Sequence, residues 1–236
     1  MLCLTWLVPV FPLIGSIING FFGLRIGKDA VGKVACGSVA LSFLTTLVLL
    51  VGLIMLPAEQ RIYEQTVFTW FAAGNFHVDF GFQIDPLSMV MMMVVTGVGL
   101  IIHVYSIGYM REEYSYYRFF AYMNLFMFAM LLLVMGNNFL LMFIGWEGVG
   151  LCSYFLIGYY FEKKSACDAG VKAFVVNRVG DFAFLLAIMY IFKIFGTVDF
   201  TEVFSAAPTA LIYGSEAVTL ITMFLFIGAT GKSAQI

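Results

Sequence analysis

Long apolar runs alternate with short polar segments along the whole chain. A transmembrane helix needs about 20 mostly apolar residues, and seven runs approach or exceed that length. They lie at roughly 4–24, 34–56, 86–108, 118–136, 138–160, 169–195 and 217–236. The pattern predicts an all-α polytopic membrane protein with about seven transmembrane helices. The seventh run reaches Ile236 without a polar flank, so we expect its helix to be incomplete and the chain to be truncated.

One connection is long enough to form structure outside the membrane. Residues 66–71 are β-prone, Gly74-Asn75 is a turn signal, and residues 76–82 alternate between apolar and polar positions. Two such runs joined by a short turn are typical of a β-hairpin. We therefore predict a small external β-hairpin over about 66–83.

Two further signals predict where helices begin. Asp85 precedes Pro86, and an aspartate N-cap followed by a proline in the first turn is typical of a helix N-terminus. Val198–Phe204 separates two apolar runs and is expected to form a short surface helix.

The composition fits a membrane protein and argues against several function classes. Hydrophobic residues make up 62% of the 236 residues and charged residues 11%, with a mean hydropathy of +1.00, whereas soluble domains carry about 25% charged residues. The net charge is −2 and no basic stripe is visible, which argues against nucleic acid as a partner. The four cysteines lack a C-x-x-C spacing, and the chain has no dinucleotide, haem or iron–sulfur motif. We therefore expect no metal, no bound cofactor and no redox centre in this chain.

Lysine and arginine are unevenly distributed between alternate connections. Eight fall in or beside the first, third and fifth connections: Arg25, Lys28, Lys33, Arg111, Arg118, Lys163, Lys164 and Lys172. The second and sixth connections hold two, Arg61 and Lys193. Because positively charged loops stay in the cytoplasm, we expect a multi-pass protein of the cell's inner (plasma) membrane with its N-terminus outside.

Four ionisable residues interrupt the apolar runs at membrane depth. Glu147 lies in the fifth run, Arg178 and Asp181 in the sixth, and Lys232 in the seventh. Charges inside a bilayer are costly and usually mark ion or proton paths. The arrangement predicts an ion-translocating membrane protein. The alternative is structural, with charges that only lock helices together.

Spacing and residue type suggest how these residues act. Arg178 and Asp181 are three residues apart on one helix face and can neutralise each other. Glu147 and Lys232 have opposite charges, and a buried lysine gives up its proton far more readily than an arginine. We therefore predict that Glu147 and Lys232 exchange a salt bridge during turnover. A weaker candidate is His103, because histidine titrates near neutral pH; the alternative is a packed or hydrogen-bonded histidine.

Segments around these residues resemble one known family. They are His103–Met110, Gly145–Tyr154, Lys172–Asp181 and Gly231–Ile236, and the resemblance extends over essentially the whole chain. They resemble the antiporter-like L subunit of respiratory complex I (NADH-quinone oxidoreductase), the bacterial counterpart of mitochondrial NADH dehydrogenase subunit 5. The A subunit of multisubunit Na+/H+ antiporters shares much of the pattern and is the alternative.

The resemblance implies a fold larger than this chain. The family folds as two inverted repeats of five transmembrane helices, each with a broken helix and a proton half-channel. Residues 1–117 would then hold the N-terminal transmembrane helices with the external hairpin, and residues 118–236 an incomplete first antiporter-like repeat. The second repeat and the long lateral helix of the family would lie outside this sequence.

The resemblance also implies a function. The family's essential glutamate falls on Glu147, its broken-helix lysine on Lys232, and its conserved arginine and aspartate on Arg178 and Asp181. The chain would be a proton-translocating membrane-arm subunit that couples quinone reduction to proton pumping. NADH, FMN, iron–sulfur clusters and quinone would be bound elsewhere in the parent complex. The partners would be the other membrane-arm subunits, the lipid bilayer and protons, and a non-catalytic membrane scaffold is the second alternative.

The distribution of charge generates a test of topology. Cysteines introduced at Lys163 and Asn75 are expected to react with a membrane-impermeant thiol reagent from opposite sides of the membrane. The reason is that Lys163 lies in a lysine-rich connection and Asn75 in the external hairpin. The measurement compares intact cells with inverted vesicles, and labelling of both positions from the same side would refute the orientation.

Overall fold

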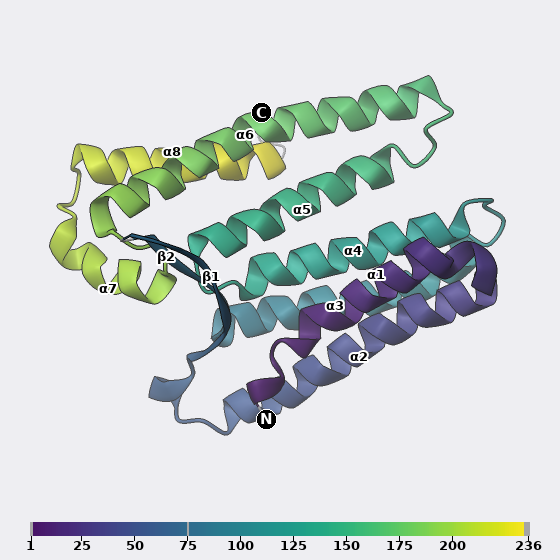
Figure 1. The fold of residues 1–236 in the computed structure, drawn as a ribbon, viewed down its shortest axis with the longest axis horizontal. Helices are drawn as coiled ribbons and strands as arrows, with labels where there is room; N and C mark the ends of the chain where they lie inside the picture. The colour runs from purple at the N-terminus through teal and green to yellow at the C-terminus, as the bar shows by residue number, and fades with distance from the viewer. Residues whose placement is uncertain (1, 75, 234–236) are drawn as a thin grey trace. The chain divides into compact units, whose positions relative to one another are not determined.

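Helices dominate the computed structural model, which describes residues 2–74 and 76–233 (Figure 1). The α-helices are α1 (Leu7–Ile26), α2 (Lys28–Ile54), α3 (Pro86–Tyr109), α4 (Tyr116–Met135), α5 (Phe139–Ile157), α6 (Lys164–Phe195), α7 (Phe200–Ala210) and α8 (Glu216–Lys232). Two strands, β1 (Tyr63–Ala73) and β2 (Phe76–Ile84), pair as a hairpin. Short 3-10 helices cover Leu2–Leu4 and Ala58–Gln60.

Within the described residues, six helical segments are long and apolar enough to cross a membrane, judged by length and composition. They are Leu2–Ile26, Lys28–Ile54, Pro86–Tyr109, Tyr116–Met135, Phe139–Ile157 and Lys164–Phe195. Helix α8 covers the predicted seventh span, but its 17 residues extend about 26 Å, less than a hydrocarbon core of about 30 Å. Residues 234–236, which end that predicted span and the Gly231–Ile236 motif, lie outside the described residues.

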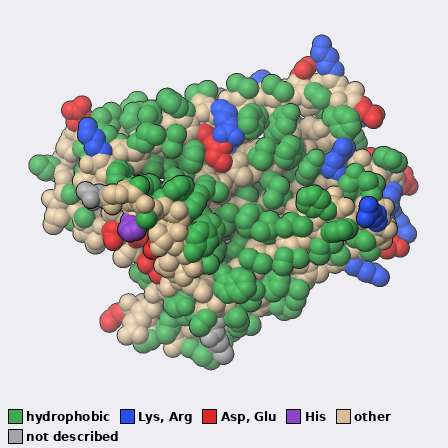
Figure 2. All heavy atoms as spheres, viewed as in Figure 1, with side chains coloured by type: hydrophobic (Ala, Val, Ile, Leu, Met, Phe, Trp, Pro, Cys, Tyr) green, Lys and Arg blue, Asp and Glu red, His purple; other side chains and the backbone are tan. Residues whose placement is uncertain are grey.

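Large hydrophobic side chains are exposed along these helices, as a surface that faces lipid requires. Figure 2 shows hydrophobic side chains over most of the face that it draws. Exposed examples are Phe21 and Leu24 on α1, Ile101 on α3 and Val179 on α6. Together with the six apolar helices, this surface identifies a multi-pass membrane protein.

The chain forms two compact units, which are described separately. The N-terminal unit comprises Met1–Gln65 and Phe82–Met135, and the C-terminal unit comprises Thr66–Gly81 and Gly136–Ile236. The division falls after α4 because α4 packs against α1. The boundary expected after residue 117 concerns the repeats of the family and stays a prediction.

Hydroxyl side chains join the helices of the N-terminal unit. Ser16 Oγ on α1 donates to Ala121 O on α4 (2.8 Å), and Ser42 Oγ on α2 donates to Val8 O on α1 (2.7 Å). Lipid offers no partner to a hydroxyl group. Bonds between neighbouring helices therefore satisfy these side chains and hold α1 against both α2 and α4.

The first and third connections meet at one end of the N-terminal unit. Gly27 joins α1 to α2 with a φ of 80°, a left-handed conformation that glycine adopts without steric cost. Beside it, Lys28 Nζ donates to Arg111 O in the α3–α4 connection (2.8 Å). This contact agrees with the predicted alternation of connections; the side of the membrane that this end faces stays a prediction.

Asn138 joins three elements of the C-terminal unit. Its side chain caps α5 by accepting from Leu141 N (2.8 Å), and its Nδ2 donates to Asp79 O on β2 (2.8 Å). The same residue forms an antiparallel bridge with Asp199, just before α7. The hairpin and the α6–α7 connection therefore lie at the same end of this unit.

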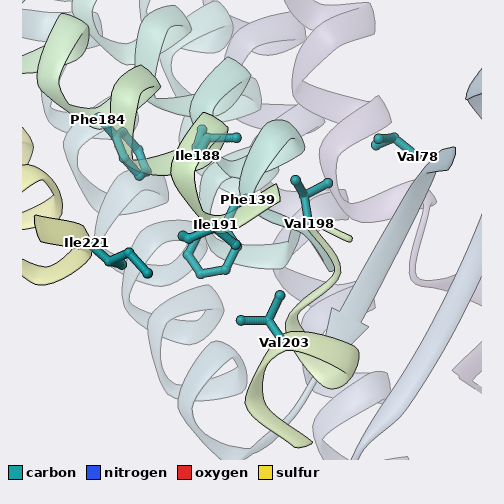
Figure 3. Packing of buried hydrophobic residues seen from close by; sticks show 8 residues of the cluster. All are labelled: Val78, Phe139, Phe184, Ile188, Ile191, Val198, Val203 and Ile221. Atoms are coloured by element: carbon teal, nitrogen blue, oxygen red, sulfur yellow. The ribbon is translucent and has the colours of Figure 1, made fainter. Parts of the chain in front are cut away.

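A cluster of buried hydrophobic residues forms the core of the C-terminal unit. Figure 3 shows its members, which are Val78, Phe139, Phe184, Ile188, Ile191, Val198, Val203 and Ile221. Three of them lie on α6, and the others come from β2, α5, α7, α8 and the α6–α7 connection. This core fixes the position of α6, which carries two of the four intramembrane charges.

The structure confirms the predicted hairpin and the short surface helix. The strands cover residues 63–73 and 76–84, against the expected range of 66–83. The predicted turn residue Asn75 lies outside the described residues. Helix α7 begins after Asp199, whose side chain caps it.

The predicted start of α3 is also confirmed. Ser88 N donates to Asp85 Oδ1 (2.7 Å), and Asp85 N donates to Ser88 Oγ (2.8 Å). This reciprocal pair is a capping box, which satisfies backbone donors that the first turn of a helix leaves unpaired. Pro86 follows as the first helical residue.

Replacing Asp85 by alanine is expected to lower the free energy of unfolding by about 1 kcal/mol, the usual effect of losing an N-cap. The measurement is denaturant unfolding of the protein in detergent micelles. Glu59→Ala, at an exposed position, is the matched loss of a carboxylate and should leave stability unchanged. Equal stability of the two variants would show that the cap contributes nothing.

Candidate functional site

The four intramembrane charges all lie in the C-terminal unit and form one cluster across three helices. Glu147 is on α5, Arg178 and Asp181 are on α6, and Lys232 is the last residue of α8. Arg178 Nη1 forms an ion pair with Glu147 Oε2, and Lys232 Nζ lies 4.0 Å from Asp181 Oδ1. The two pairs therefore tie α6 to two different helices.

This pairing differs from the one that the sequence spacing suggests. Arg178 and Asp181 each pair with another helix instead of neutralising each other. Residues three apart lie on the same side of a helix; from there Arg178 reaches Glu147 on α5, while Asp181 lies close to Lys232 on α8. A Glu147–Lys232 salt bridge is not formed among the described residues, and its formation during turnover stays a prediction.

Burial increases across the cluster from Arg178 to Asp181. The exposed fraction of the side chain is 44% for Arg178, 21% for Glu147, 17% for Lys232 and 5% for Asp181. The Arg178 guanidinium also lies over the ring of Phe174, 4.4 Å from its centroid, where a cation is attracted by the ring face. The Glu147–Arg178 pair is thus the more exposed part of the cluster, and Asp181–Lys232 the more buried part.

A tryptophan holds the buried carboxylate of Asp181. Trp146 Nε1 donates to Asp181 Oδ1 (2.7 Å), and the indole ring packs edge-on against Phe184 with centroids 5.3 Å apart. A hydrogen bond to a charged group contributes about 1.5–3 kcal/mol. Sequence reasoning missed Trp146, although it directly precedes Glu147. The signal that was available is an indole N–H at membrane depth, which needs an acceptor when buried.

A glycine provides the space that the Lys232 ammonium occupies. A Cβ atom at Gly150 on α5 would collide with Lys232 Nζ. The ammonium lies 5.8 Å from the centroid of the Trp146 ring, and no described residue accepts a hydrogen bond from it. Within the described part of the chain, Lys232 is therefore held by electrostatic attraction and not by a direct hydrogen bond.

Three glycines bring α6 and α8 into backbone contact, and Figure 1 shows the two helices side by side. A Cβ atom at Gly180 on α6 would lie 3.2 Å from Gly228 O and 3.3 Å from Gly231 Cα on α8. Small residues at a crossing allow two backbones to approach closely. This contact carries Lys232, the residue after Gly231, to Asp181, the residue after Gly180.

His103 belongs to the N-terminal unit. Its ring is fully buried, with Nδ1 2.7 Å from Gly99 O and Nε2 2.8 Å from Asn124 Oδ1. Asn124 Nδ2 in turn donates to Ser38 Oγ (3.0 Å). These contacts favour the hydrogen-bonded histidine that the sequence left open as an alternative.

The candidate site is built from charged side chains and their aromatic neighbours. Among residues 2–74 and 76–233, no group of three or more His, Cys, Asp or Glu side chains could hold a metal ion. The chemistry that the described cluster offers is proton binding and ion pairing, because Glu147, Asp181 and Lys232 can each gain or lose a proton.

Two family models match the chain. The model described as NADH-Ubiquinone oxidoreductase (complex I), chain 5 N-terminus, matches residues 70–120. The model described as NADH:quinone oxidoreductase/Mrp antiporter, TM, matches residues 136–236. The second range contains all four residues of the charge cluster.

Curated relatives cover nearly the whole chain. NADH-quinone oxidoreductase subunit L of Mycobacterium tuberculosis (strain ATCC 25618 / H37Rv) is 44% identical over 98% of this chain and 36% of its own length. Subunit L of Escherichia coli (strain K12) is 42% identical over 100% of this chain and 38% of its own length. NADH-ubiquinone oxidoreductase chain 5 of Rhizopus stolonifer is 42% identical over 97% of this chain and 34% of its own length. The chain thus spans little more than a third of the length of these relatives.

Solved structures share the fold. A chain of the Mrp complex from Dietzia sp. DQ12-45-1b matches with a TM-score of 0.81 and 21% identity, over 97% of this chain and 23% of that chain. A chain of the membrane-bound sulfane sulfur reductase, an archaeal respiratory membrane complex, matches with a TM-score of 0.76 and 19% identity. The match covers 96% of this chain and 33% of that chain. The fold and the cluster of intramembrane charges together define an antiporter-like membrane subunit. Within that class, the chain belongs to the NADH-quinone oxidoreductase subunit L family, which includes chain 5 of NADH-ubiquinone oxidoreductase.

Gly180→Ala is expected to push α8 away from α6, because the new Cβ atom would press on backbone atoms that cannot rotate aside. Overpacking of this kind lowers the free energy of unfolding by about 1–3 kcal/mol. Gly37→Ala on α2 is the matched control, since nothing lies within 4 Å of its new Cβ atom. Denaturant unfolding in detergent micelles measures the stability of both variants. If Gly180→Ala were as stable as Gly37→Ala, a tight crossing of α6 and α8 would be ruled out.

Proposed function

We propose that this chain is the N-terminal part of a proton-translocating membrane-arm subunit of NADH:quinone oxidoreductase. The observation that carries the proposal is the cluster formed by Glu147, Arg178, Asp181 and Lys232. The first three lie on helices that are long and apolar enough to cross a membrane. Intramembrane charges are retained where they move ions or protons. Relatives named as subunit L, at 40–44% identity, support the assignment to this enzyme.

Charge balance explains why such a cluster can pass protons. Two cations and two carboxylates sum to zero, which lowers the cost of burying them together. Arg178 remains protonated under all conditions, so it acts as a fixed charge. The other three groups can each take up or release one proton. Any such change unbalances the cluster and favours a rearrangement of its ion pairs.

Two contacts support a movement of Lys232 between two carboxylates. Its ammonium packs against Gly150 on α5, one helical turn from Glu147, while Asp181 lies 4.0 Å away on α6. Lysine has a flexible stem and a compact charge that moves easily between acceptors. We propose that Lys232 shifts between Asp181 and Glu147 as protons are bound and released. Arg178 pairs with Glu147 when Lys232 lies at Asp181.

The coupling chemistry would lie elsewhere in the parent enzyme. NADH, FMN, iron–sulfur clusters and quinone would be bound by other subunits, and this chain would be a translocase component without its own redox step. The other membrane-arm subunits would be its partners. We further propose a bacterial plasma-membrane location, because relatives named subunit L come from bacteria. The lysine and arginine distribution supports an N-terminus outside.

Substitution of the cluster tests the proposal in the full-length subunit within its assembled complex. Glu147→Gln and Lys232→Ala are each expected to reduce proton uptake into vesicles about 10-fold or more, as for groups that transfer protons directly. The double variant should lose less than the two single losses combined, with a coupling energy of about 0.5–3 kcal/mol, because the residues act on one another.

Two exposed charges supply matched controls: Glu162 in the α5–α6 connection and Lys164, the first residue of α6. Glu162→Gln and Lys164→Ala make the same chemical changes outside the cluster and should leave proton uptake as in the wild type. Normal proton uptake with poor assembly in the cluster variants would favour a scaffold. Uptake that depends on a sodium gradient and not on quinone reduction would favour a Na+/H+ antiporter subunit.

A further inference from the structure

Two donors are directed at the same oxygen atom of Asp181. Trp146 Nε1 donates to Oδ1 over 2.7 Å, and Lys232 Nζ lies 4.0 Å from that same Oδ1. Hydrogen bonds from an ammonium to a carboxylate are about 2.7–2.9 Å long. The indole N–H is therefore at bonding distance from Oδ1, whereas the Lys232 ammonium is more than 1 Å too far for a direct hydrogen bond.

The surroundings of Lys232 keep it in this position. The face of the Trp146 ring lies 5.8 Å from Nζ, close enough to attract a cation. The absence of a side chain at Gly150, one turn further along α5, leaves room for the ammonium. No residue in the described part of the chain accepts a hydrogen bond from Nζ. The lysine is attracted by Asp181 and by the indole ring without being bound to either.

We propose that Trp146 is a positioning residue for Lys232: its N–H fixes the orientation of the Asp181 carboxylate, so that the ammonium stays 4.0 Å from Oδ1 and does not close to bonding distance. This inference rests on the proposed function, since it concerns how easily Lys232 leaves Asp181. A direct ammonium–carboxylate hydrogen bond is about twice as strong as a neutral one. Without the indole N–H, Lys232 would move onto Oδ1, bind it tightly and leave it slowly.

The place of Trp146 in α5 links both ion pairs of the cluster. Trp146 and Glu147 are consecutive residues, so α5 presents the indole N–H to Asp181 and the carboxylate to Arg178 at the same time. A small displacement of α5 along α6 would loosen both contacts together. The Asp181 carboxylate would then be free to turn toward Lys232 at the moment when Glu147 leaves Arg178.

The experiment removes only the N–H group. In the full-length subunit of the assembled complex, Trp146 is replaced by the analogue in which sulfur takes the place of the indole N–H, and by Phe as a second variant. Both keep an aromatic ring against Phe184. We expect proton uptake into vesicles to fall on the order of 10-fold, the effect of losing a hydrogen bond to a charged group, while assembly stays normal. Fluorotryptophan, which keeps the N–H, should restore the wild-type rate.

The same sulfur analogue at Trp70, in the hairpin, is the matched control and should have no effect. A second measurement repeats Trp146→Phe in an Asp181→Asn background, where little further loss is expected because Trp146 acts through that carboxylate. An equal loss in both backgrounds would mean that the ring acts by packing, and the inference would fall. Wild-type uptake with the sulfur analogue would overturn it as well.

Lys232→Ala in the same preparation separates this inference from the proposed function. If Lys232→Ala abolishes proton uptake but the sulfur analogue does not reduce it, Lys232 carries protons and Trp146 does not position it. If Lys232→Ala leaves uptake intact, the proposed function fails first, and the role of Trp146 fails with it.

Discussion

A charge inside a bilayer has to be compensated by the protein itself, and the arrangement of the C-terminal unit follows from this constraint. Asp181 is nearly fully buried, and it has the Trp146 N–H and the Lys232 ammonium within reach. Lys232 arrives there because Gly180 allows α8 to touch α6, and its head group fits because Gly150 has no side chain. The glycines and the charges therefore depend on one another. A side chain in place of a glycine displaces the cation. Loss of the cation leaves a carboxylate uncompensated, which is strongly destabilising.

The cluster combines a fixed charge with a movable one. Arg178 keeps its proton and is stacked on Phe174 while paired with Glu147. Lys232 has no hydrogen-bond acceptor among the described residues. If Glu147 takes up a proton, Arg178 loses its partner, and if Lys232 releases one, Asp181 loses its nearest cation. Each protonation change thus alters the electrostatic attraction between side chains on neighbouring helices. A proton bound or released in the cluster would therefore change how strongly α5, α6 and α8 attract one another.

Periodicity and local signals predicted most of the secondary structure but little of the pairing inside the cluster. Apolar runs of about 20 residues located six spans, and the Asp85-Pro86 signal located the start of α3, because both depend on short-range chemistry. The four charges were visible for the same reason. Their partners were not, because pairing depends on how the helices are rotated and where they cross. Trp146 escaped notice because its role exists only once α5 lies against α6, and the division after α4 likewise depends on packing between distant segments.

The two units bury different kinds of polar group: hydroxyl, amide and imidazole groups in the N-terminal unit, and a carboxylate beside amide and hydroxyl groups in the C-terminal unit. In the N-terminal unit, Ser16 and Ser42 donate to backbone carbonyls of neighbouring helices, and a backbone acceptor cannot move without moving its helix. Such bonds have one stable arrangement and hold helices in place. In the C-terminal unit the partners are charged groups at the ends of side chains: Arg178 pairs with Glu147, and Lys232 lies 4.0 Å from Asp181. The proposed movement of Lys232 toward Glu147 would give the cluster a second arrangement. Two arrangements of similar energy are what a switch requires. We therefore expect substitutions at the serines to reduce stability alone, and substitutions at Lys232 to reduce proton transfer as well.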